Sequence, residues 1–229
     1  MWNRTILKSN AKIALTGRYW VAFAVSLLTS LLGGGYSFLT KGIHMAWTLP
    51  PYGDILLMIF VSMPFVIGTC RFFLHNHFGV TDFGTVFSGF QLNYSNGVGA
   101  MFVTNLLIGL WSLLLVVPGI IKALEYTMVP YLLADNPSLP GSRAREISRM
   151  MTNGEKWNIL VLELSFLGWF LLGTLCLGVG ILFVIPYFNA TMTELYIYLR
   201  DRAIQTNMLN PAELGLVQPA QEYRQPYQY

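Results

Sequence analysis

The stretch that decides the fold runs from Leu139 to Tyr198. It opens with Ser142-Arg-Ala-Arg-Glu-Ile-Ser-Arg-Met-Met-Thr-Asn-Gly154, a basic amphipathic segment. Two apolar runs follow, Trp157 to Leu177 and Val179 to Leu199, with only Gly178 and its neighbours between them. Because about 20 apolar residues span the hydrocarbon layer of a bilayer, each run predicts a transmembrane helix. The pattern is a surface helix followed by a transmembrane hairpin.

The composition also indicates a membrane protein. Of the 229 residues, 54% are hydrophobic and only 11% are charged, whereas about a quarter of a soluble domain is charged. The net charge of +3 is small and scattered, so it gives no argument for binding nucleic acid. Cys70 and Cys176 lie in or near apolar runs, which favours small buried side chains over a disulfide or a metal pair. No cleavable signal peptide is evident before the first apolar run.

Four more apolar runs precede the deciding stretch. We expect them to span the bilayer at Tyr19–Leu39, Ile55–Leu74, Val98–Val117 and Pro118–Ala134. Pro64 lies inside the second of these spans, and it should kink the helix unless a neighbouring group satisfies the carbonyl that it frees. The sequence therefore predicts an all-α, polytopic integral membrane protein with six transmembrane helices.

One design recurs three times, in segments of about 1–75, 81–135 and 139–200. Each segment has an amphipathic surface helix, a turn with glycine and then a hairpin. The second and third hairpins also place a proline and a tyrosine in the returning helix, at Pro130-Tyr131 and Pro186-Tyr187. We therefore predict a threefold hairpin repeat with three interfacial amphipathic helices.

The repeats form a single transmembrane domain over residues 1–202. Residues 203–229 form a polar tail, which contains Pro211, Pro219 and Pro226 and which we expect to be disordered at least beyond Val217.

The positions of lysine and arginine predict the orientation, because cytoplasmic flanks collect basic residues. If the amino terminus is cytoplasmic, the outer side receives only Lys41, with Lys122 inside the fourth span near that side. The basic residues on the cytoplasmic side are then Arg4, Lys8, Lys12, Arg18, Arg71, Arg143, Arg145, Arg149, Lys156, Arg200, Arg202 and Arg224. We expect a multi-pass protein of the cell membrane with both termini in the cytoplasm.

Polar residues inside the spans are the first candidates for function, because a charge in the bilayer is costly unless it is paired or solvated. The buried polar or ligand candidates are Asn105, Lys122, Glu125, Glu163, Asn189 and Glu194. One interpretation is structural: they hold helices together, and Lys122 and Glu125, three residues apart, pair with each other. The other is that Asn105, Lys122, Glu125, Glu163 and Asn189 line a polar path or a pocket for a lipid headgroup.

Basic residues on the surface helices are the second group of candidates. We expect contacts with anionic lipid from Lys8, Lys12, Arg143, Arg145 and Arg149. The alternative is that these residues only fix the topology. His75 and His77 could be half of a metal site, but no further histidine or cysteine lies at suitable spacing, so we expect none. Nucleotide-binding, zinc-protease and hydrolase motifs are also missing, so we expect neither a cofactor nor an enzyme.

Several stretches resemble one known family. They are Leu7-Lys-Ser-Asn-Ala-Lys-Ile-Ala-Leu-Thr-Gly-Arg-Tyr-Trp20, Pro118-Gly-Ile-Ile-Lys-Ala-Leu-Glu-Tyr126, Met128-Val-Pro-Tyr-Leu-Leu-Ala-Asp135 and Leu164-Ser-Phe-Leu-Gly-Trp169. Together they resemble the bacterial membrane family known as domain of unknown function 975, up to about Leu199. That family is similar in architecture to the membrane domain of some glycerophosphodiester phosphodiesterases. The resemblance implies a polytopic protein of the bacterial cytoplasmic membrane, and it transfers no site residues.

Two functions remain open from the sequence. The first is a non-catalytic membrane protein that organises lipids or a partner protein at the inner leaflet, since the three surface helices carry most of the surface chemistry. The partner would be another membrane protein or a second copy of the chain. The alternative is a small transporter or channel that uses the buried polar groups.

Overall fold

The structure is a computed structural model that describes residues 2–33, 58–175 and 178–216. Within these ranges the chain is helical and has no strand. The helices are α1 (Arg4–Leu15), α2 (Tyr19–Gly33), the π-helix η1 (Met58–Ser62), α5 (Met63–His77), the 3-10 helix η2 (Phe83–Phe87), α6 (Ser88–Gln91), α7 (Tyr94–Leu114), α8 (Val116–Tyr126), α9 (Val129–Asp135), α10 (Gly141–Thr152), α11 (Lys156–Leu175), α12 (Val179–Gln205) and the 3-10 helix η3 (Pro211–Leu214).

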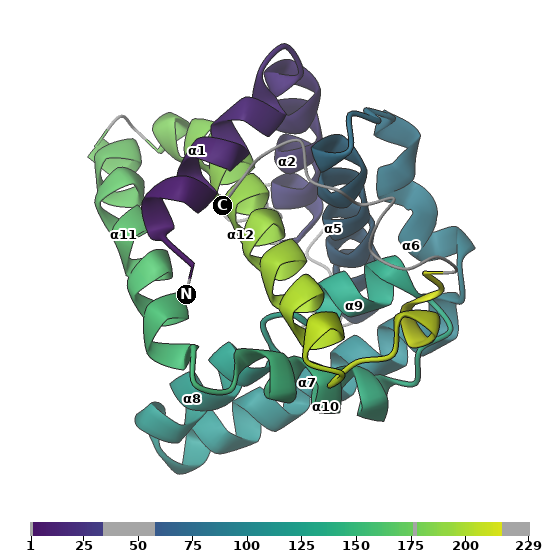
Figure 1. The fold of residues 1–229 in the computed structure, drawn as a ribbon. Coiled ribbons are helices and arrows are strands. Elements are labelled where there is room, and N and C mark those ends of the chain that lie inside the picture. Colours follow the sequence, from purple (N-terminus) through teal and green to yellow (C-terminus); the bar gives the residue numbers. More distant parts are fainter. Residues whose placement is uncertain (1, 34–57, 176–177, 217–229) are drawn as a thin grey trace, which may run out of the picture.

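The long helices form pairs that lie around a common centre (Figure 1). Helix α2 packs against α5, α7 against α8, and α11 against α12. Five helical stretches are long and apolar enough to cross a membrane, and a sixth is counted if α1 and α2 are taken as one bent span. The predicted all-α architecture with several apolar spans is thus confirmed. The first predicted span, Tyr19–Leu39, extends outside the described residues, because these stop at Gly33.

The surface segments connect the pairs in a cyclic order. Helix α1 packs on α12, the η2–α6 segment packs on α5, and α10 packs on α7, α8 and α9. Each surface segment therefore lies against the pair that precedes it, and the first surface segment lies against the last pair. This arrangement brings α1 and α12 side by side although they are at opposite ends of the sequence (Figure 1).

A sharp turn separates each surface segment from the helix that follows. Helices α1 and α2 meet at 102°, and Gly17 between them has a φ of +74°. Gly154 takes the same left-handed conformation between α10 and α11, and Asn93 does so before α7. Glycine and asparagine are the residues that adopt this conformation at the lowest cost, so they fix the turns between these segments and the helices that follow.

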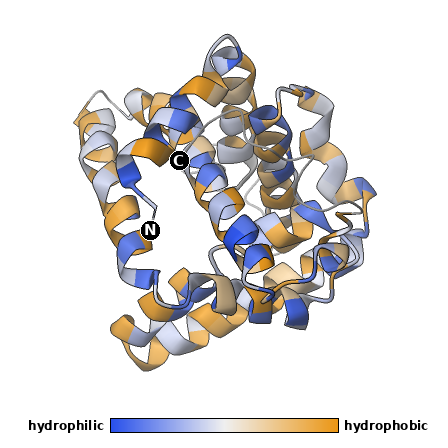
Figure 2. Ribbon diagram, viewed as in Figure 1, coloured by the Kyte–Doolittle hydropathy of each residue, from blue (hydrophilic) through white to orange (hydrophobic). Residues whose placement is uncertain are grey.

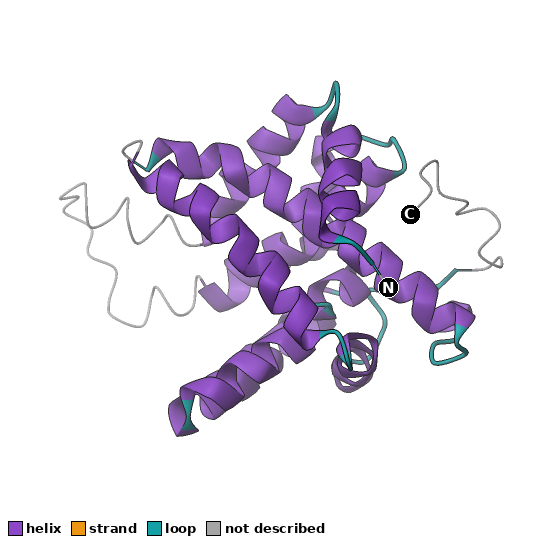
Figure 3. Cartoon of the chain, turned by 60° about the vertical axis from the view of Figure 1, so that its left-hand side comes forward, coloured by secondary structure: helices purple, strands orange, loops and turns teal. Residues whose placement is uncertain are grey.

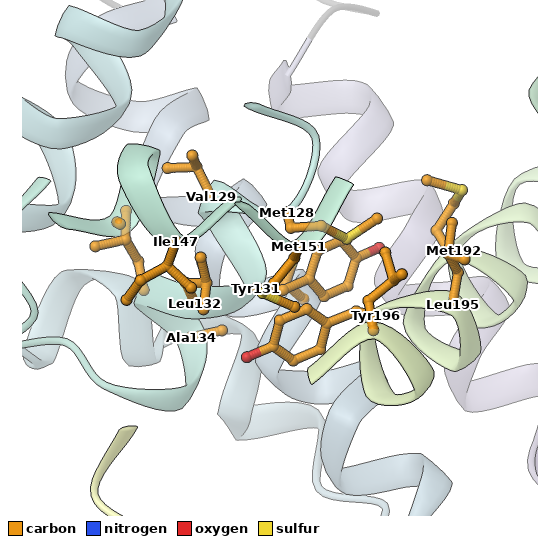
Figure 4. Close-up of a cluster of buried hydrophobic side chains, with 14 of the residues drawn as sticks. Met128, Val129, Tyr131, Leu132, Ala134, Ile147, Met151, Met192, Leu195 and Tyr196 are labelled. Atoms are coloured by element: carbon orange, nitrogen blue, oxygen red, sulfur yellow. The ribbon is translucent and has the colours of Figure 1, made fainter. Parts of the chain in front are cut away.

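The packed core lies where α9, α10 and α12 meet (Figure 4). Tyr131 and Tyr196 stack with their ring centroids 5.2 Å apart. Leu132, Ile147 and Leu195 surround them and are fully buried. Close packing of such side chains supplies most of the attraction between helices that are themselves surrounded by lipid.

Pro64, in the second predicted span, frees a backbone carbonyl, and a side chain of another helix pairs with it. Helix α5 has Pro64 in its first turn, and the preceding residues form the π-helix η1. Proline cannot donate to the carbonyl four residues earlier, which belongs to Phe60. The hydroxyl of Tyr94, the first residue of α7, donates to that carbonyl at 2.9 Å. A neighbouring helix therefore satisfies the freed group.

The α7–α8 hairpin projects from the body of the molecule with an apolar surface (Figures 2 and 3). At its tip Leu113 is 86% exposed and Val116 is 70% exposed. Exposed apolar side chains on long helices are expected where the surroundings are lipid rather than water.

The residues at the start of the predicted polar tail pack on the core. Helix α12 continues to Gln205, and Leu209 and Leu214 beyond it are buried. These two leucines anchor the segment as far as residue 216. The expected disorder beyond Val217 concerns residues outside the described ranges.

Candidate functional site

Several charged side chains near the ends of the helices are held in ion pairs. Glu125, which is buried on α8, accepts hydrogen bonds of 2.6 Å from both Lys122 and Lys156. Lys122 also lies 5.7 Å from the ring centroid of Trp111. The carboxylate joins α8 to α11, and its charge is neutralised by these two cations. This contact agrees with the structural interpretation, in which Lys122 and Glu125 pair with each other.

A second group of charges joins α9 to α12. Arg200 is 1% exposed and donates to Asp135 at 3.1 Å, and Tyr196 donates to the same carboxylate at 2.6 Å. Arg71, on α5, donates to the carbonyls of Ala134 and Leu133 at the end of α9. Removing one partner of such a buried pair is strongly destabilising, so these residues hold the helix ends together.

A third pair lies between α5 and α12. Nδ1 of His77 and Oε1 of Glu194 are 2.5 Å apart, and both residues are buried. The predicted candidate Glu194 therefore contacts a histidine of another helix, a partner that sequence spacing could not identify. His75, the other histidine considered for a metal site, is exposed.

The remaining polar candidates do not meet at one place. Asn105 is exposed on α7, so the expectation that it is buried is wrong, because its side of the helix has no neighbour. Asn189 is half-buried on α12 and its backbone carbonyl accepts from Thr193. Glu163 is half-buried on α11, where no ion pair or hydrogen bond joins its side chain to another part of the described chain. The six predicted residues therefore do not form one common site.

Cations without a carboxylate or carbonyl partner gather on two helices. Within the described residues, the basic side chains that have neither an ion pair nor a hydrogen bond to a backbone carbonyl are Arg4, Lys8, Lys12, Arg145 and Arg149. The first three are on α1 and the last two are on α10. These helices therefore present positive charge that the protein itself does not neutralise.

An open cavity of about 940 Å³ lies between α1 and the α11–α12 pair. Its polar wall is one face of α1, and its apolar wall comes from the two long helices. The lining residues are Asn3, Arg4, Thr5, Lys8, Ser9, Lys12, Ser165, Trp169, Phe183, Val184 and Tyr187.

The two lysines of this cavity are held in place. The ammonium of Lys8 donates to Oγ of Ser165 at 2.7 Å and lies 4.4 Å from the ring centroid of Phe166. The ammonium of Lys12 lies 5.8 Å from the ring centroid of Tyr187. An aromatic ring face attracts a cation without neutralising it, so both charges remain available to an anion.

The chemistry of the cavity suits an amphipathic anion. The three basic residues and the hydroxyl groups of Thr5, Ser9 and Ser165 can surround a phosphate, while Trp169 and Phe183 offer apolar surface. Trp169 is 57% exposed and Phe183 is 46% exposed, so this surface is open to the surroundings.

Helix α10 forms a smaller polar cavity of about 250 Å³. It is lined by Tyr126, Ser142, Arg145, Glu146 and Arg149. Nη1 of Arg145 is buried, and it has no hydrogen-bond partner in the described part of the chain. This cavity contains the second group of cations without a carboxylate partner.

Arg143 was predicted to contact lipid together with Arg145 and Arg149, but its guanidinium already forms ion pairs with two carboxylates of the protein. Its Nε donates to Glu213 at 2.8 Å, and its Nη1 donates to Glu146 at 2.9 Å. The hydrogen bonds from Arg143 hold the pKa of Glu213 below its usual value. In turn, the carboxylates of Glu213 and Glu146 raise the pKa of Arg143. Arg143 fastens η3 to α10.

Glu155 ties α1 to the end of α12 just outside the long helices. Burial would raise the pKa of Glu155, but hydrogen bonds from Asn158 and Arg202 bring it below its usual value. The indole of Trp2 also donates to Glu155, at 3.1 Å, and thereby fixes the start of the chain.

Together these features indicate a helical, multi-pass membrane protein. A family model described as "Protein of unknown function (DUF975)" matches residues 55–203. The chain belongs to this family, as its resemblance predicted. No curated protein and no solved structure matches the chain, so the similarity to the membrane domain of glycerophosphodiester phosphodiesterases is not supported by a match.

A shared spacing of basic residues, glycine and tryptophan marks both cavities in the sequence, although it matches no known motif. Lys8, Lys12, Gly17 and Trp20 recur at the same spacing as Arg145, Arg149, Gly154 and Trp157. Identity elsewhere is low, so the pattern becomes visible only when the left-handed glycines are aligned. The hydroxyl of Ser165 and the ring of Tyr187 could not be assigned to the site from sequence, because they come from distant helices.

Proposed function

We propose that this chain is a non-catalytic protein of the bacterial cytoplasmic membrane that binds and organises anionic lipid at the inner leaflet. It crosses the bilayer six times in three repeated hairpins, with both termini in the cytoplasm. The segments α1, η2–α6 and α10 lie at the cytoplasmic surface. The cyclic packing of these segments and the left-handed turn after each of them support this topology.

The observation that carries the proposal is the cavity between α1 and the α11–α12 pair. It combines three cations that have no carboxylate partner with exposed aromatic surface. A phospholipid has the matching parts, which are an anionic headgroup and apolar chains. Each basic residue near the membrane surface contributes about 1 kcal/mol to binding an anionic lipid, so the two lysines should contribute about 2 kcal/mol.

The alternative of a transporter or channel receives less support. Lys122 and Glu125 neutralise each other together with Lys156, and Glu194 contacts His77. Asn105 faces away from the other helices. We propose that these residues join helices, and that Glu163 is the one whose role remains to be tested in a flux assay.

The test uses the purified full chain in nanodiscs that contain phosphatidylglycerol and phosphatidylcholine. Native mass spectrometry after release measures how many phosphatidylglycerol molecules stay bound. The double variant Lys8→Gln/Lys12→Gln should lose one retained phosphatidylglycerol, and Lys8→Arg/Lys12→Arg should keep it. Unchanged retention in the glutamine variant, with helical content preserved, would show that the proposed site is wrong.

A further inference from the structure

The two basic surface helices have the same backbone geometry. Helices α1 and α10 are each 12 residues long, and each ends in a residue with extended backbone, Thr16 or Asn153. A left-handed glycine follows in both, with φ of +74° at Gly17 and +78° at Gly154. The two segments are therefore alike in conformation, although their sequences differ at most positions.

The hydrogen bonds of the two turns also correspond. In the first, Thr16 donates to the carbonyl of Ile13, Arg18 to that of Leu15 and Ala22 to that of Arg18. At the same positions of the second, the backbone bonds are Asn153 to Met150, Glu155 to Thr152 and Ile159 to Glu155. Trp20 and Trp157 occupy matching positions and are both 72% exposed. The correspondence thus includes backbone bonds and exposure.

The cavity linings correspond residue by residue on these helices. When Gly17 is aligned with Gly154, four α1 residues that line the larger cavity match the four α10 residues that line the smaller one, whereas Arg4 has Gly141 at its position. The matched pairs are Thr5 with Ser142, Lys8 with Arg145, Ser9 with Glu146, and Lys12 with Arg149. The opposite walls differ, because residues of α11 and α12 line the larger cavity, whereas Tyr126 of α8 faces α10 across the smaller one.

The middle surface segment lacks this site. Alignment on its left-handed residue Asn93 places Gly84 and Ser88 where the cations would be. A Cβ atom on Gly68 would lie 1.8 Å from the carbonyl oxygen of Val86, and one on Gly89 would lie 2.0 Å from that of Pro64. Backbone contact therefore fills the space between this segment and α5, and only two of the three surface segments can hold an anion.

From this correspondence we infer that the α10 cavity is a second phosphate site, which takes the headgroup phosphodiester of one anionic lipid. Arg145 and Arg149 bind it, and the buried Nη1 of Arg145 supplies a donor that has no partner in the described protein. The charge of Glu146 is engaged by Arg143 at 2.9 Å, so it opposes the anion only weakly. The inference deepens the proposed function and rests on it: the chain binds two anionic lipids.

The two sites differ in what they enclose. The α1 cavity is about 940 Å³ and has apolar walls, whereas the α10 cavity is about 250 Å³ and is lined mainly by polar residues. We therefore expect the α10 site to hold the phosphate group alone, with the lipid chains outside it. Loss of both arginines should weaken binding about 30-fold, since each cation is worth about fivefold.

The experiment counts phosphatidylglycerol on the full chain by native mass spectrometry after release from mixed nanodiscs. The wild type should retain two molecules, Arg145→Gln/Arg149→Gln one, and the variant that also carries Lys8→Gln/Lys12→Gln none. Arg145→Lys/Arg149→Lys should retain two, which separates loss of charge from loss of folding. Arg18→Gln is the control, because it removes a positive charge that lines neither cavity, and it should also retain two.

Two results would overturn the inference, and they differ from failure of the proposed function. If the α10 double variant keeps as many lipids as the wild type while the lysine variant loses one, the second site is wrong and the first stands. If inorganic phosphate or glycerol 3-phosphate at millimolar concentration displaces the lipid lost in the α10 variant, the site takes a soluble phosphate instead. If the lysine variant keeps both lipids, the proposed function fails at α1.

Discussion

The span Ile59–His77, which contains α5, and helix α11 are both long and apolar enough to cross a membrane, but they occupy opposite environments. In the most apolar part of the α5 span 72% of the residues are buried, and in that of α11 only 22% are buried. The less buried helix is also the more apolar of the two. In a soluble protein this order would be reversed, because water exposes polar surface and buries apolar surface. Apolar character in this chain therefore indicates contact with lipid, and burial indicates contact with other helices.

The comparison predicts a large difference between matched leucine truncations. Leu74 on α5 is 3% exposed, and Leu167 on α11 is 51% exposed. Leu74→Ala should lower the free energy of unfolding by about 2 to 5 kcal/mol, because it leaves a cavity. Leu167→Ala should change it by less than about 0.5 kcal/mol. Reversible unfolding in mixed micelles measures both, and equal effects would contradict the assignment of the two environments.

A positive charge should be tolerated on α5, where protein groups can bind it, and should be costly on the lipid-facing side of α11. Helix α5 already buries Arg71, whose guanidinium donates to carbonyls of α9. On α11, Leu167→Arg places a cation against lipid without such partners and should cost about 2.5 to 3.5 kcal/mol of insertion free energy. An insertion assay on α11 with a glycosylation reporter checks this, with Leu167→Gln as a milder comparison. Insertion equal to that of the wild type would mean that this face of α11 contacts protein or water.

The tight contact of α5 with the middle surface segment offers a sharper test. Gly68 has no room for a Cβ atom, since the oxygen of Val86 would lie 1.8 Å away. Gly68→Ala should therefore destabilise the protein by about 1 to 3 kcal/mol through overpacking. Gly109 on α7 has nothing within 4 Å, so Gly109→Ala is the matched control and should be neutral or slightly stabilising. Thermal unfolding of the two variants in detergent gives the difference.

The smallest expected effect concerns the pH dependence of the carboxyl-terminal segment. The pKa of Glu213 is lowered in the folded protein by its hydrogen bonds with Arg143. The stabilisation is therefore complete at neutral pH and is lost as the pH falls through this lowered pKa. Because both side chains are 33% exposed, it should amount to no more than about 1 kcal/mol.

Hydrogen exchange of η3 at pH 7 and at pH 3 measures this effect. The segment should open more readily at the lower pH in the wild type, and Glu213→Gln should open equally at both. A pH dependence that persists in the glutamine variant would assign the effect to another group.

The sequence predicted the architecture well because lengths of apolar runs are a local property. The hairpin from Trp157 to Leu199 was recognisable from its residues alone, and so were the surface helices before Gly17 and Gly154. The pairing of Lys122 with Glu125 also followed from helical spacing.

The composition of the site could not be predicted in the same way. Glu125 also binds Lys156 from another helix, and Glu194 contacts His77 on α5. Asn105 was misjudged because its position in an apolar run does not tell which side of α7 faces lipid. Leu209 and Leu214 were assigned to a polar tail because two isolated leucines do not form a pattern. Each of these outcomes depends on tertiary contacts between distant segments.

Helix α1 packs mainly on α12, so the two helices become neighbours only after the residues between them have been synthesised. Until then Leu7, which is completely buried in the finished molecule, lacks most of its cover. Assembly of the helices is therefore completed by a contact between segments that lie far apart in the sequence.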